Sequence, residues 1–584
     1  MKRVLAYLKP YTRFMSFTLT VKCFATLIEL ALPYILSHII DNVIRPTAEI
    51  ESPDIKAKTI EIVIWALIMI ACAALGVIGS VWANRMAAKF AKDVAQDLRS
   101  DLFRRTMTLS PAQTDHFTVP SLESRLTTDT YNIHNFINTM QRMGVRAPIL
   151  LIGGLAITAT LDGALTLVMI AILPFLFIAV YTLTAKGLPL YTKVQKAVDG
   201  MIRVVREDAQ GIRVIKALTK QDYEYRRYDK VNRDLAYIEG KTNSIMSSAN
   251  PVMSFFMNLG LVCVVFVGAY RVNGGNSEPG NIIAFIQYFT LISMAMTSIT
   301  RIFVIWSKAN ASAKRIAEVL DTPEGLPVSD SSDYPRRAGE RGIVFDHVDF
   351  AYNNTKDILH DISFELGAGK KLGIIGATGS GKTTLTALLM RFYDVSSGSI
   401  RIDGRDVRTI PEEELHSMFG VAMQHDFIIA ESIRENIRFG RDVSDEQIKR
   451  AAKIAQASSF IEAYEDGYDH HIDAKGANIS GGQKQRLLIA RAVAGQPKIL
   501  ILDDSSSALD YKTDAELRRA IGSELAETTT VIVAQRVSSV MSCDLILVID
   551  EGRIIGAGDH EKLMNTCGVY SEISRSQMGG AILE

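Results

Sequence analysis

The chain has 584 residues, too many for a single hydrophobic core, and its 64 lysines and arginines are balanced by 64 aspartates and glutamates. This zero net charge argues against a bulk nucleic-acid-binding protein, so no nucleic-acid partner is expected. The five cysteines show neither metal-ligand spacing nor the pattern of a disulfide framework. Apolar runs long enough to cross a bilayer occur only before about residue 306, and the sequence after about residue 340 is typical of a soluble α/β domain.

The first half of the chain is predicted to be an all-α transmembrane domain. Residues 2–13 are basic and amphipathic, which favours a helix on the membrane surface. A secretory signal is disfavoured because Lys22 and Glu29 interrupt the apolar run that follows. Hydropathy and length then predict six spans: Phe14–Ile44, Ile60–Val81, Ala147–Leu161, Ala164–Thr184, Met246–Tyr270 and Ile282–Ile305.

Lysine and arginine are concentrated in the two long connections that follow the second and fourth predicted spans. The loops on the other side are short and mixed or acidic: the first contains Glu49, Glu51 and Asp54, and the others are Asp162-Gly163 and Asn273–Gly280. Because basic loops stay in the cytoplasm, both termini are expected there, in a multi-pass protein of the cell (plasma or inner) membrane.

Each basic connection has helical periodicity with few breakers. We expect two helices that continue about 20–25 residues beyond the membrane, joined by a short transverse segment. The candidate segments are Pro111–Ser121 and Gly211–Leu218. Composition places a transmembrane domain at 1–320, a linker at 321–340 and a second domain at 341–584.

Several polar side chains lie in or near the apolar runs: Lys22, Glu29, Arg142, Arg146, Asn258 and Arg301. Such groups usually face a protein interior or a water-filled cavity, where they could contact a substrate. The basic ones could equally extend to the inner interface. Both interpretations stay open.

The second domain contains a phosphate-binding loop. The segment Gly376-Ala377-Thr378-Gly379-Ser380-Gly381-Lys382-Thr383, followed by Thr384, comes after a predicted strand (Lys371–Ile375) and before a predicted helix (Leu385–Phe392). In this context the glycines let backbone N–H groups surround phosphates. Lys382 reaches the β- and γ-phosphates of ATP, and Thr383 can bind Mg²⁺.

A second buried strand, Lys498–Leu502, ends in two acids. Asp503 is suited to holding Mg²⁺, and Asp504 follows it. Farther upstream, Tyr352 is a candidate for stacking on adenine. The segment Ser480-Gly481-Gly482-Gln483 at the start of a predicted helix forms a second potential anion-binding site.

The phosphate-binding loop, Ser480–Gln483 and the paired acids, in this order, resemble the ATP-binding domain of ATP-binding cassette (ABC) transporters. With six preceding spans, the whole chain resembles a half-transporter of the multidrug or lipid exporter type. The resemblance implies an α/β P-loop NTPase domain with a helical subdomain. It also implies that Pro111–Ser121 and Gly211–Leu218 are coupling helices seated on ATP-binding domains.

The resemblance further assigns roles to single residues. It gives Tyr352 the adenine and makes Gln424 the link between Mg²⁺ or water and the membrane domain. Ser480–Gln483 becomes the signature loop, which caps ATP bound to the other subunit, and Asp510 belongs to the loop that crosses the dimer interface.

Two residues depart from the family pattern. Asp504 replaces the glutamate that acts as catalytic base, and Gln535 replaces a histidine that contacts the γ-phosphate. The shorter acid retracts the carboxylate by roughly 1.5 Å, and a misplacement of about 1 Å can cost on the order of 10²-fold in rate. Glutamine cannot titrate near neutral pH, although it still donates hydrogen bonds.

We therefore expect a subunit of a heterodimeric ATP-driven exporter with a weak or inactive site of its own. Its partner would be a second half-transporter with the glutamate and histidine intact. A slow homodimeric exporter and an ATP-gated channel or regulatory subunit are the alternatives. The substrate is expected to be an amphiphilic small molecule, lipid or peptide, and the sequence does not choose among them.

Overall fold

The computed structural model describes most of the chain, namely residues 1–44, 55–337, 339–352, 357–424, 427–505 and 508–578. The acids Glu49, Glu51 and Asp54 of the first outer loop lie outside the described residues. The chain forms two compact units. The first comprises residues 1–107 and 119–322, and the second comprises residues 108–118 and 323–584.

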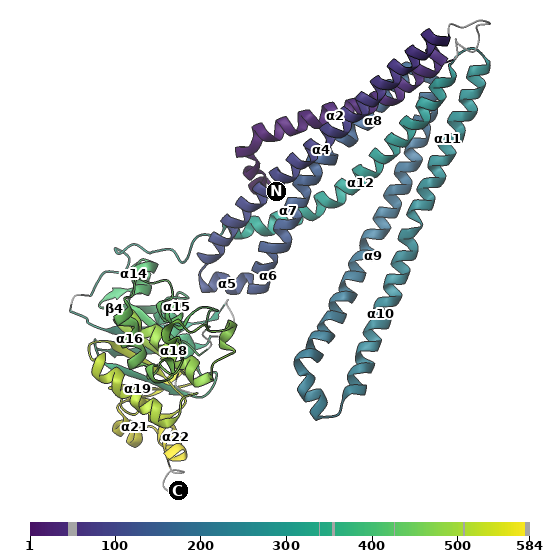
Figure 1. Ribbon diagram of the computed structural model, residues 1–584. Helices are drawn as coiled ribbons and strands as arrows, with labels where there is room; N and C mark the ends of the chain where they lie inside the picture. The colour runs from purple at the N-terminus through teal and green to yellow at the C-terminus, as the bar shows by residue number, and fades with distance from the viewer. Residues whose placement is uncertain (45–54, 338, 353–356, 425–426, 506–507, 579–584) are drawn as a thin grey trace. The chain divides into compact units, whose positions relative to one another are not determined.

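The first unit is helical throughout its described residues (Figure 1). Its helices are α1 (Lys2–Leu5), η1 (Ala6–Tyr11), α2 (Thr12–His38), η2 (Ile39–Ile44), α4 (Ile55–Met107), α6 (Val119–Ser124), η3 (Arg125–Asp129), α7 (Thr130–Thr139), η4 (Met140–Gly144), α8 (Arg146–Leu161), α9 (Gly163–Ala217), α10 (Gln221–Ser247), α11 (Ala249–Asn273) and α12 (Pro279–Asp321).

Every predicted span lies within these helices. Five helical stretches are long and apolar enough to cross a membrane: Lys2–Ile44, Thr59–Met107, Val119–Leu161, Gln221–Asn273 and Pro279–Asp321. The predicted fourth span lies in α9, whose start, Gly163–Ala179, is a shorter apolar segment.

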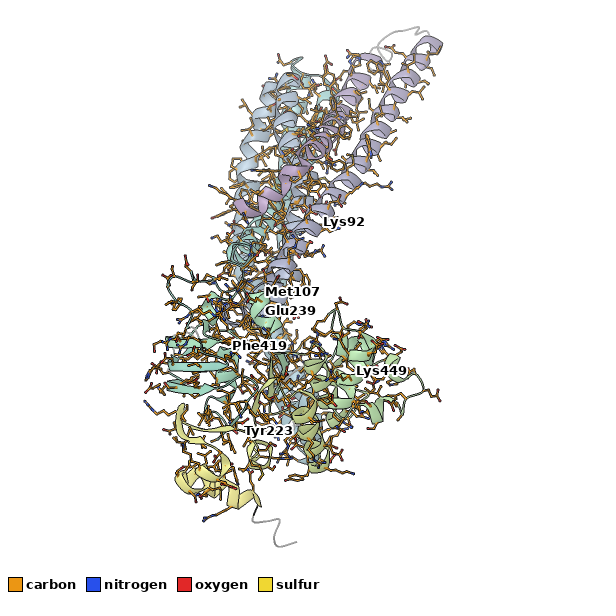
Figure 2. The ribbon with its side chains drawn as sticks, turned by 90° about the vertical axis from the view of Figure 1, so that its left-hand side faces the viewer. Lys92, Met107, Tyr223, Glu239, Phe419 and Lys449 are labelled. Atoms are coloured by element: carbon orange, nitrogen blue, oxygen red, sulfur yellow. The ribbon has the colours of Figure 1, made fainter. Side chains whose placement is uncertain are left out.

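Many of the large apolar side chains of α4 are exposed at the surface of the unit rather than buried in a core. Six of the large apolar side chains between residues 60 and 78 are 59–65% exposed: Ile60, Leu67, Ile70, Leu75, Val77 and Ile78. An apolar surface of this extent is expected where a helix faces lipid or a partner subunit. The helix has 53 residues, or roughly 80 Å at 1.5 Å per residue, so it extends well beyond a bilayer core of about 30 Å. Lys92 and Met107 lie on its continuation past the apolar part (Figure 2).

Three of the polar side chains in the spans, Lys22, Glu29 and Arg146, have partners within the membrane domain. The ammonium group of Lys22 donates to Ser80 Oγ at 2.6 Å and to Asn84 Oδ1 at 3.3 Å. Arg146 forms two hydrogen bonds with Glu29, at 2.5 and 3.1 Å. Pairing of this kind is expected for charged side chains within a membrane domain.

The two long connections differ from each other. In the first, a separate short helix, α5 (Pro111–Phe117), joins α4 to α6. In the second, the expected transverse segment Gly211–Leu218 is wrong, because α9 runs without interruption to Ala217 and a short turn leads into α10. Helices α9 and α10 lie antiparallel and side by side (Figure 1). Between residues 211 and 217, Gly211 is the only glycine or proline, and one glycine costs a helix only about 1 kcal/mol.

The second unit contains two sheets. An antiparallel four-stranded sheet has the order β2-β1-β4-β5, and a six-stranded sheet has the order β10-β9-β3-β8-β7-β6. The strands are β1 (Ile343–Phe350), β2 (Leu359–Leu366), β3 (Lys371–Gly376), β4 (Ser397–Ile402), β5 (Arg405–Asp406), β6 (Phe419–Ala422), β7 (Ile499–Asp503), β8 (Thr529–Val533), β9 (Leu545–Asp550) and β10 (Arg553–Gly558).

Helices lie between the strands along the chain and after the last of them. Besides α5, they are α13 (Lys382–Leu389), η6 (Val407–Thr409), α14 (Glu412–Ser417), α15 (Ile433–Arg438), α16 (Asp445–Ile454), α17 (Ser458–Ile461), η7 (Gly467–Asp469), η8 (Ala474–Gly476), α18 (Gly481–Ala494), α19 (Tyr511–Glu524), α20 (Val537–Val540), α21 (His560–Thr566) and α22 (Gly568–Met578). Helices α15 to α18 share one core, which includes Ile437, Ile448, Ile461 and Ile489. This core corresponds to the expected helical subdomain.

Candidate functional site

Strands β3, β8, β7 and β6 are parallel, so their carboxyl ends meet at one edge of the sheet. Strand β3 ends at the phosphate-binding loop and β7 ends in Asp503. Gln535 follows β8 and Gln424 follows β6. The sheet topology therefore brings together four segments that are far apart in the sequence.

A cavity of about 330 Å³ opens at this edge. Its size lies within the range of small-molecule sites, about 300–1,000 Å³. It is lined by Ile358, Thr378, Gly379, Gly381, Lys382, Thr383, Thr384, Gln424, Asp503, Asp504, Val533, Ala534 and Gln535. Ten of the predicted site residues thus share one cavity.

The phosphate-binding loop has the backbone that such a loop requires. Gly379 and Gly381 have φ angles of +85° and +103°, and a Cβ atom at Gly381 would lie 2.6 Å from Leu359 Cδ2. Lys382 Nζ donates to the carbonyl oxygens of Gly376 and Ala377, at 3.0 and 2.7 Å. Burial lowers the pKa of Lys382, and the charges of Asp503 and Asp504 oppose this shift.

The loop is suited to a triphosphate and a magnesium ion. Within the described part of the chain, the buried Ser380 Oγ has no hydrogen-bond partner. Thr383 and the buried Asp503 line the same cavity, where they offer a hydroxyl and a carboxylate. Mg²⁺ is commonly held by one or two such oxygen ligands together with phosphate oxygens, so these residues fit Mg²⁺ and ATP.

Asp504 is held by two amides. Its Oδ2 accepts hydrogen bonds from Gln424 Nε2 at 3.2 Å and from Gln535 Nε2 at 3.1 Å. Burial raises the pKa of Asp504, and the charges of Lys382 and Arg536 and the two amide bonds oppose this rise. The residue has a φ angle of +47°, in the left-handed region.

The loop of Gln535 is fixed by a residue that sequence reasoning missed. Gln577 on α22 accepts a hydrogen bond from the Val537 N–H at 2.8 Å and donates to the Gln535 carbonyl at 2.9 Å. One side-chain amide therefore satisfies two backbone groups on either side of Arg536. No motif marks Gln577, because the contact depends on how the C-terminal helix packs.

Tyr352 does not line the cavity directly. Its hydroxyl donates to Thr384 Oγ1 at 3.2 Å, which places the ring beside the residue that follows Thr383. Gly376 and Ser380 are not among the cavity-lining residues. A Cβ atom at Gly376 would lie 2.1 Å from the Ile549 carbonyl oxygen and 2.9 Å from Ser380 Oγ, so the loop requires glycine there.

The predicted signature loop lies outside this cavity. Ser480 caps α18: its Oγ accepts from the Gln483 N–H at 3.3 Å, and Gln483 Oε1 accepts from the Ser480 N–H at 2.8 Å. Asp510 caps α19 by accepting from the Thr513 N–H at 2.9 Å. The chain therefore does not bring Ser480–Gln483 or Asp510 to its own phosphate-binding loop.

Comparisons with known proteins cover both units. Residues 15–296 match the model of the ABC transporter transmembrane region, and residues 359–507 match the ABC transporter model.

Full-length relatives are similar along the whole chain. An uncharacterized ABC transporter ATP-binding protein of Mycobacterium tuberculosis is 32% identical over 583 residues, covering 98% of this chain and 97% of the relative. The ABC transporter ATP-binding protein YknU of Bacillus subtilis is 33% identical over 582 residues, covering 98% and 96%. The solved structure of a bacterial Atm1-family ABC exporter with ATP bound has the same fold, with a TM-score of 0.81 at 24% identity, covering 98% of this chain and 99% of that one.

Proposed function

Because the chain belongs to the ABC transporter family, with a transmembrane region and an ATP-binding domain in one polypeptide, we propose that it is one subunit of a heterodimeric exporter. In this proposal it binds ATP at a degenerate site of its own. It also completes the hydrolytic site of a partner subunit that carries the family's glutamate and histidine.

The cavity residues divide the work of holding the nucleotide. The phosphate-binding loop and Lys382 hold the phosphates, and Lys382 leaves its two loop carbonyls to do so. Thr383 and Asp503 hold Mg²⁺, with Gln424 beside them. Bound Mg²⁺ neutralises charge on the phosphates. Tyr352 stacks on the adenine.

The state of Asp504 is the observation that carries the degenerate site. Its carboxylate is about one C–C bond shorter than the family's glutamate. The oxygen that would take a proton from water already accepts two amide N–H groups. These two bonds occupy that oxygen and favour its ionised form, against the rise in pKa that burial causes. Gln535 supplies one of the bonds where the family has a titratable histidine.

The position of Ser480–Gln483 supports a role toward a partner. The loop has a complete capping box, and its backbone N–H groups open α18 outside the chain's own cavity. The N-terminus of a helix favours bound anions, here the γ-phosphate of ATP in the partner's site.

Export is the direction we propose, in the cell membrane with both termini and the ATP-binding domain in the cytoplasm. The fold matches that of a solved structure described as an exporter, and the predicted inner connections carry the basic residues. The transported substrate is amphiphilic. Paired charges such as Arg146 and Glu29 stand among otherwise apolar spans.

ATP turnover by the chain alone tests the proposal. The purified chain in lipid nanodiscs should hydrolyse ATP slowly, and D504E/Q535H should raise the rate on the order of 10²-fold. K382A serves as the control that removes nucleotide binding. Rapid turnover by the lone chain would instead indicate an active homodimer, and D504N would then show whether Asp504 acts as its catalytic base.

A further inference from the structure

A line of contacts joins the phosphate-binding loop to α5. Tyr393 donates a hydrogen bond from its hydroxyl to Asp115 Oδ2 on α5. Its ring meets that of Tyr352 edge to face, with centroids 4.9 Å apart and an interplanar angle of 89°. Tyr352 in turn donates to Thr384 Oγ1 at 3.2 Å, two residues after Lys382.

Residues 108–118 belong to the second unit although they lie between two helices of the first in sequence. Hydrogen bonds join this segment to the one after α12: the Gly325 N–H donates to the Thr108 carbonyl at 2.8 Å, and the Gln113 side chain donates from Nε2 to the Pro323 and Gly325 carbonyls. None of these bonds involves Tyr352 or the phosphate-binding loop.

The Asp115–Tyr393 bond differs because it leads to the nucleotide. Burial and the neighbouring Asp115 raise the pKa of Tyr393, so its hydroxyl stays protonated and remains a donor. A hydroxyl that donates to a carboxylate forms a charge-assisted bond, stronger than a neutral one. Tyr393 is therefore tied firmly to α5 at one end and packed against Tyr352 at the other.

We propose that Tyr393 is a positioning residue through which stacking of adenine on Tyr352 orders α5. The proposal rests on the proposed function, because it assumes that Tyr352 contacts the base of ATP. It goes beyond that function because α5 would respond to the base as well as to the phosphates. Since coupling between sites is reciprocal, the position of α5 would also tune the affinity for adenine.

Hydrogen exchange on the full chain in nanodiscs tests the proposal. We expect ATP to slow exchange in peptides covering both residues 376–384 and residues 108–118. Inorganic triphosphate, which has no base, should slow exchange only in residues 376–384. Equal protection of residues 108–118 by both ligands would overturn the proposal, because the signal would then not pass through Tyr352.

Two conservative variants approach the contact from its two ends. Y393F removes only the hydroxyl and D115A removes only its acceptor. Each should abolish the ATP-dependent protection of residues 108–118, and the double variant should do no more. Coupling between two sites typically changes affinity about 5–150-fold. Because each variant removes only one contact in the line, we expect ATP affinity to change by less than about tenfold.

Y464F is the matched control, because Tyr464 stacks on His470 in the helical subdomain. It should leave the protection of residues 108–118 unchanged. Persistence of that protection in Y393F and D115A would overturn the role of Tyr393. Absence of ATP protection even in residues 376–384 would instead overturn the proposed function.

Discussion

Asp504 shows how backbone and chemistry favour the same residue. Its φ angle of +47° lies in a region that non-glycine residues rarely adopt, and aspartate tolerates it better than most because its short side chain can bond locally. The two amide bonds from Gln424 and Gln535 hold the carboxylate there. A longer acid would have to lose both bonds or shift the loop.

A first prediction concerns stability. D504E should lower the free energy of unfolding of the nucleotide-free chain by about 1 kcal/mol, because glutamate is less suited to the left-handed backbone. Thermal unfolding in nanodiscs measures the change. Glu527→Asp, on an exposed turn, is the control for exchanging these two acids. A D504E chain as stable as the original would contradict the backbone argument.

The raised pKa of Asp504 gives a second prediction. A carboxyl whose pKa is higher in the folded than in the unfolded chain stabilises the fold below its unfolded value, about 3.9. That contribution is lost as pH rises through the folded value. D504N cannot ionise, so its Tm should exceed that of the original at neutral pH, and the difference should vanish near pH 4. A D504N chain that is less stable than the original at neutral pH would contradict a raised pKa of Asp504 in the folded chain.

At the scale of elements, the site depends on strands that deliver residues and on a helix that holds them. The resemblance to ABC transporters assigns Gln424, Asp504 and Gln535 to one nucleotide site, and in the structure the parallel strands β6, β7 and β8 bring them together at a shared carboxyl edge. The two hydrogen bonds from Gln577 on α22 could not be predicted, because they depend on tertiary packing between distant segments. The uninterrupted end of α9 was missed for a related reason: a chain with helical periodicity carries no mark where its direction reverses.

The contact between Gln577 and the Gln535 loop leads to a third prediction. Q577A removes two hydrogen bonds to backbone, each worth about 0.5–1.5 kcal/mol, and should lower the free energy of unfolding by about 1–3 kcal/mol. Hydrogen exchange in residues 533–538 should accelerate, and ATP affinity should fall with it. S576A on the neighbouring exposed position is the control. Unchanged exchange would mean that the loop keeps its position without α22.

At the scale of the whole molecule, the proposed heterodimer should use the two halves of this chain's ATP machinery unequally. In that proposal its phosphate-binding loop serves the weak site and its signature loop serves the hydrolytic site of the partner. A fourth prediction follows for the complex with its partner. G481D should reduce ATP turnover on the order of 10²-fold or more, because it places a carboxylate where the γ-phosphate binds. K382A should reduce it less than about tenfold.

G481A is the steric control for the signature variant, since among the described residues the added Cβ would come within 4 Å of Ala508 Cβ alone, at 3.9 Å. ATP turnover of the purified complex measures all three variants. Equal losses from K382A and G481D would indicate two equivalent sites and contradict the asymmetry.

The second unit is assembled from two separate pieces of chain, so the polypeptide passes between units at three points: Met107–Thr108, Thr118–Val119 and Thr322–Pro323. During synthesis α5 leaves the ribosome long before Tyr393 and the segment after α12, which it contacts. Because domains usually fold as units while the chain emerges, the ATP-binding domain cannot be completed in one stretch of translation. The domain can assemble only after residues 323–584 have been made, and α5 must then dock onto them although it was synthesised much earlier.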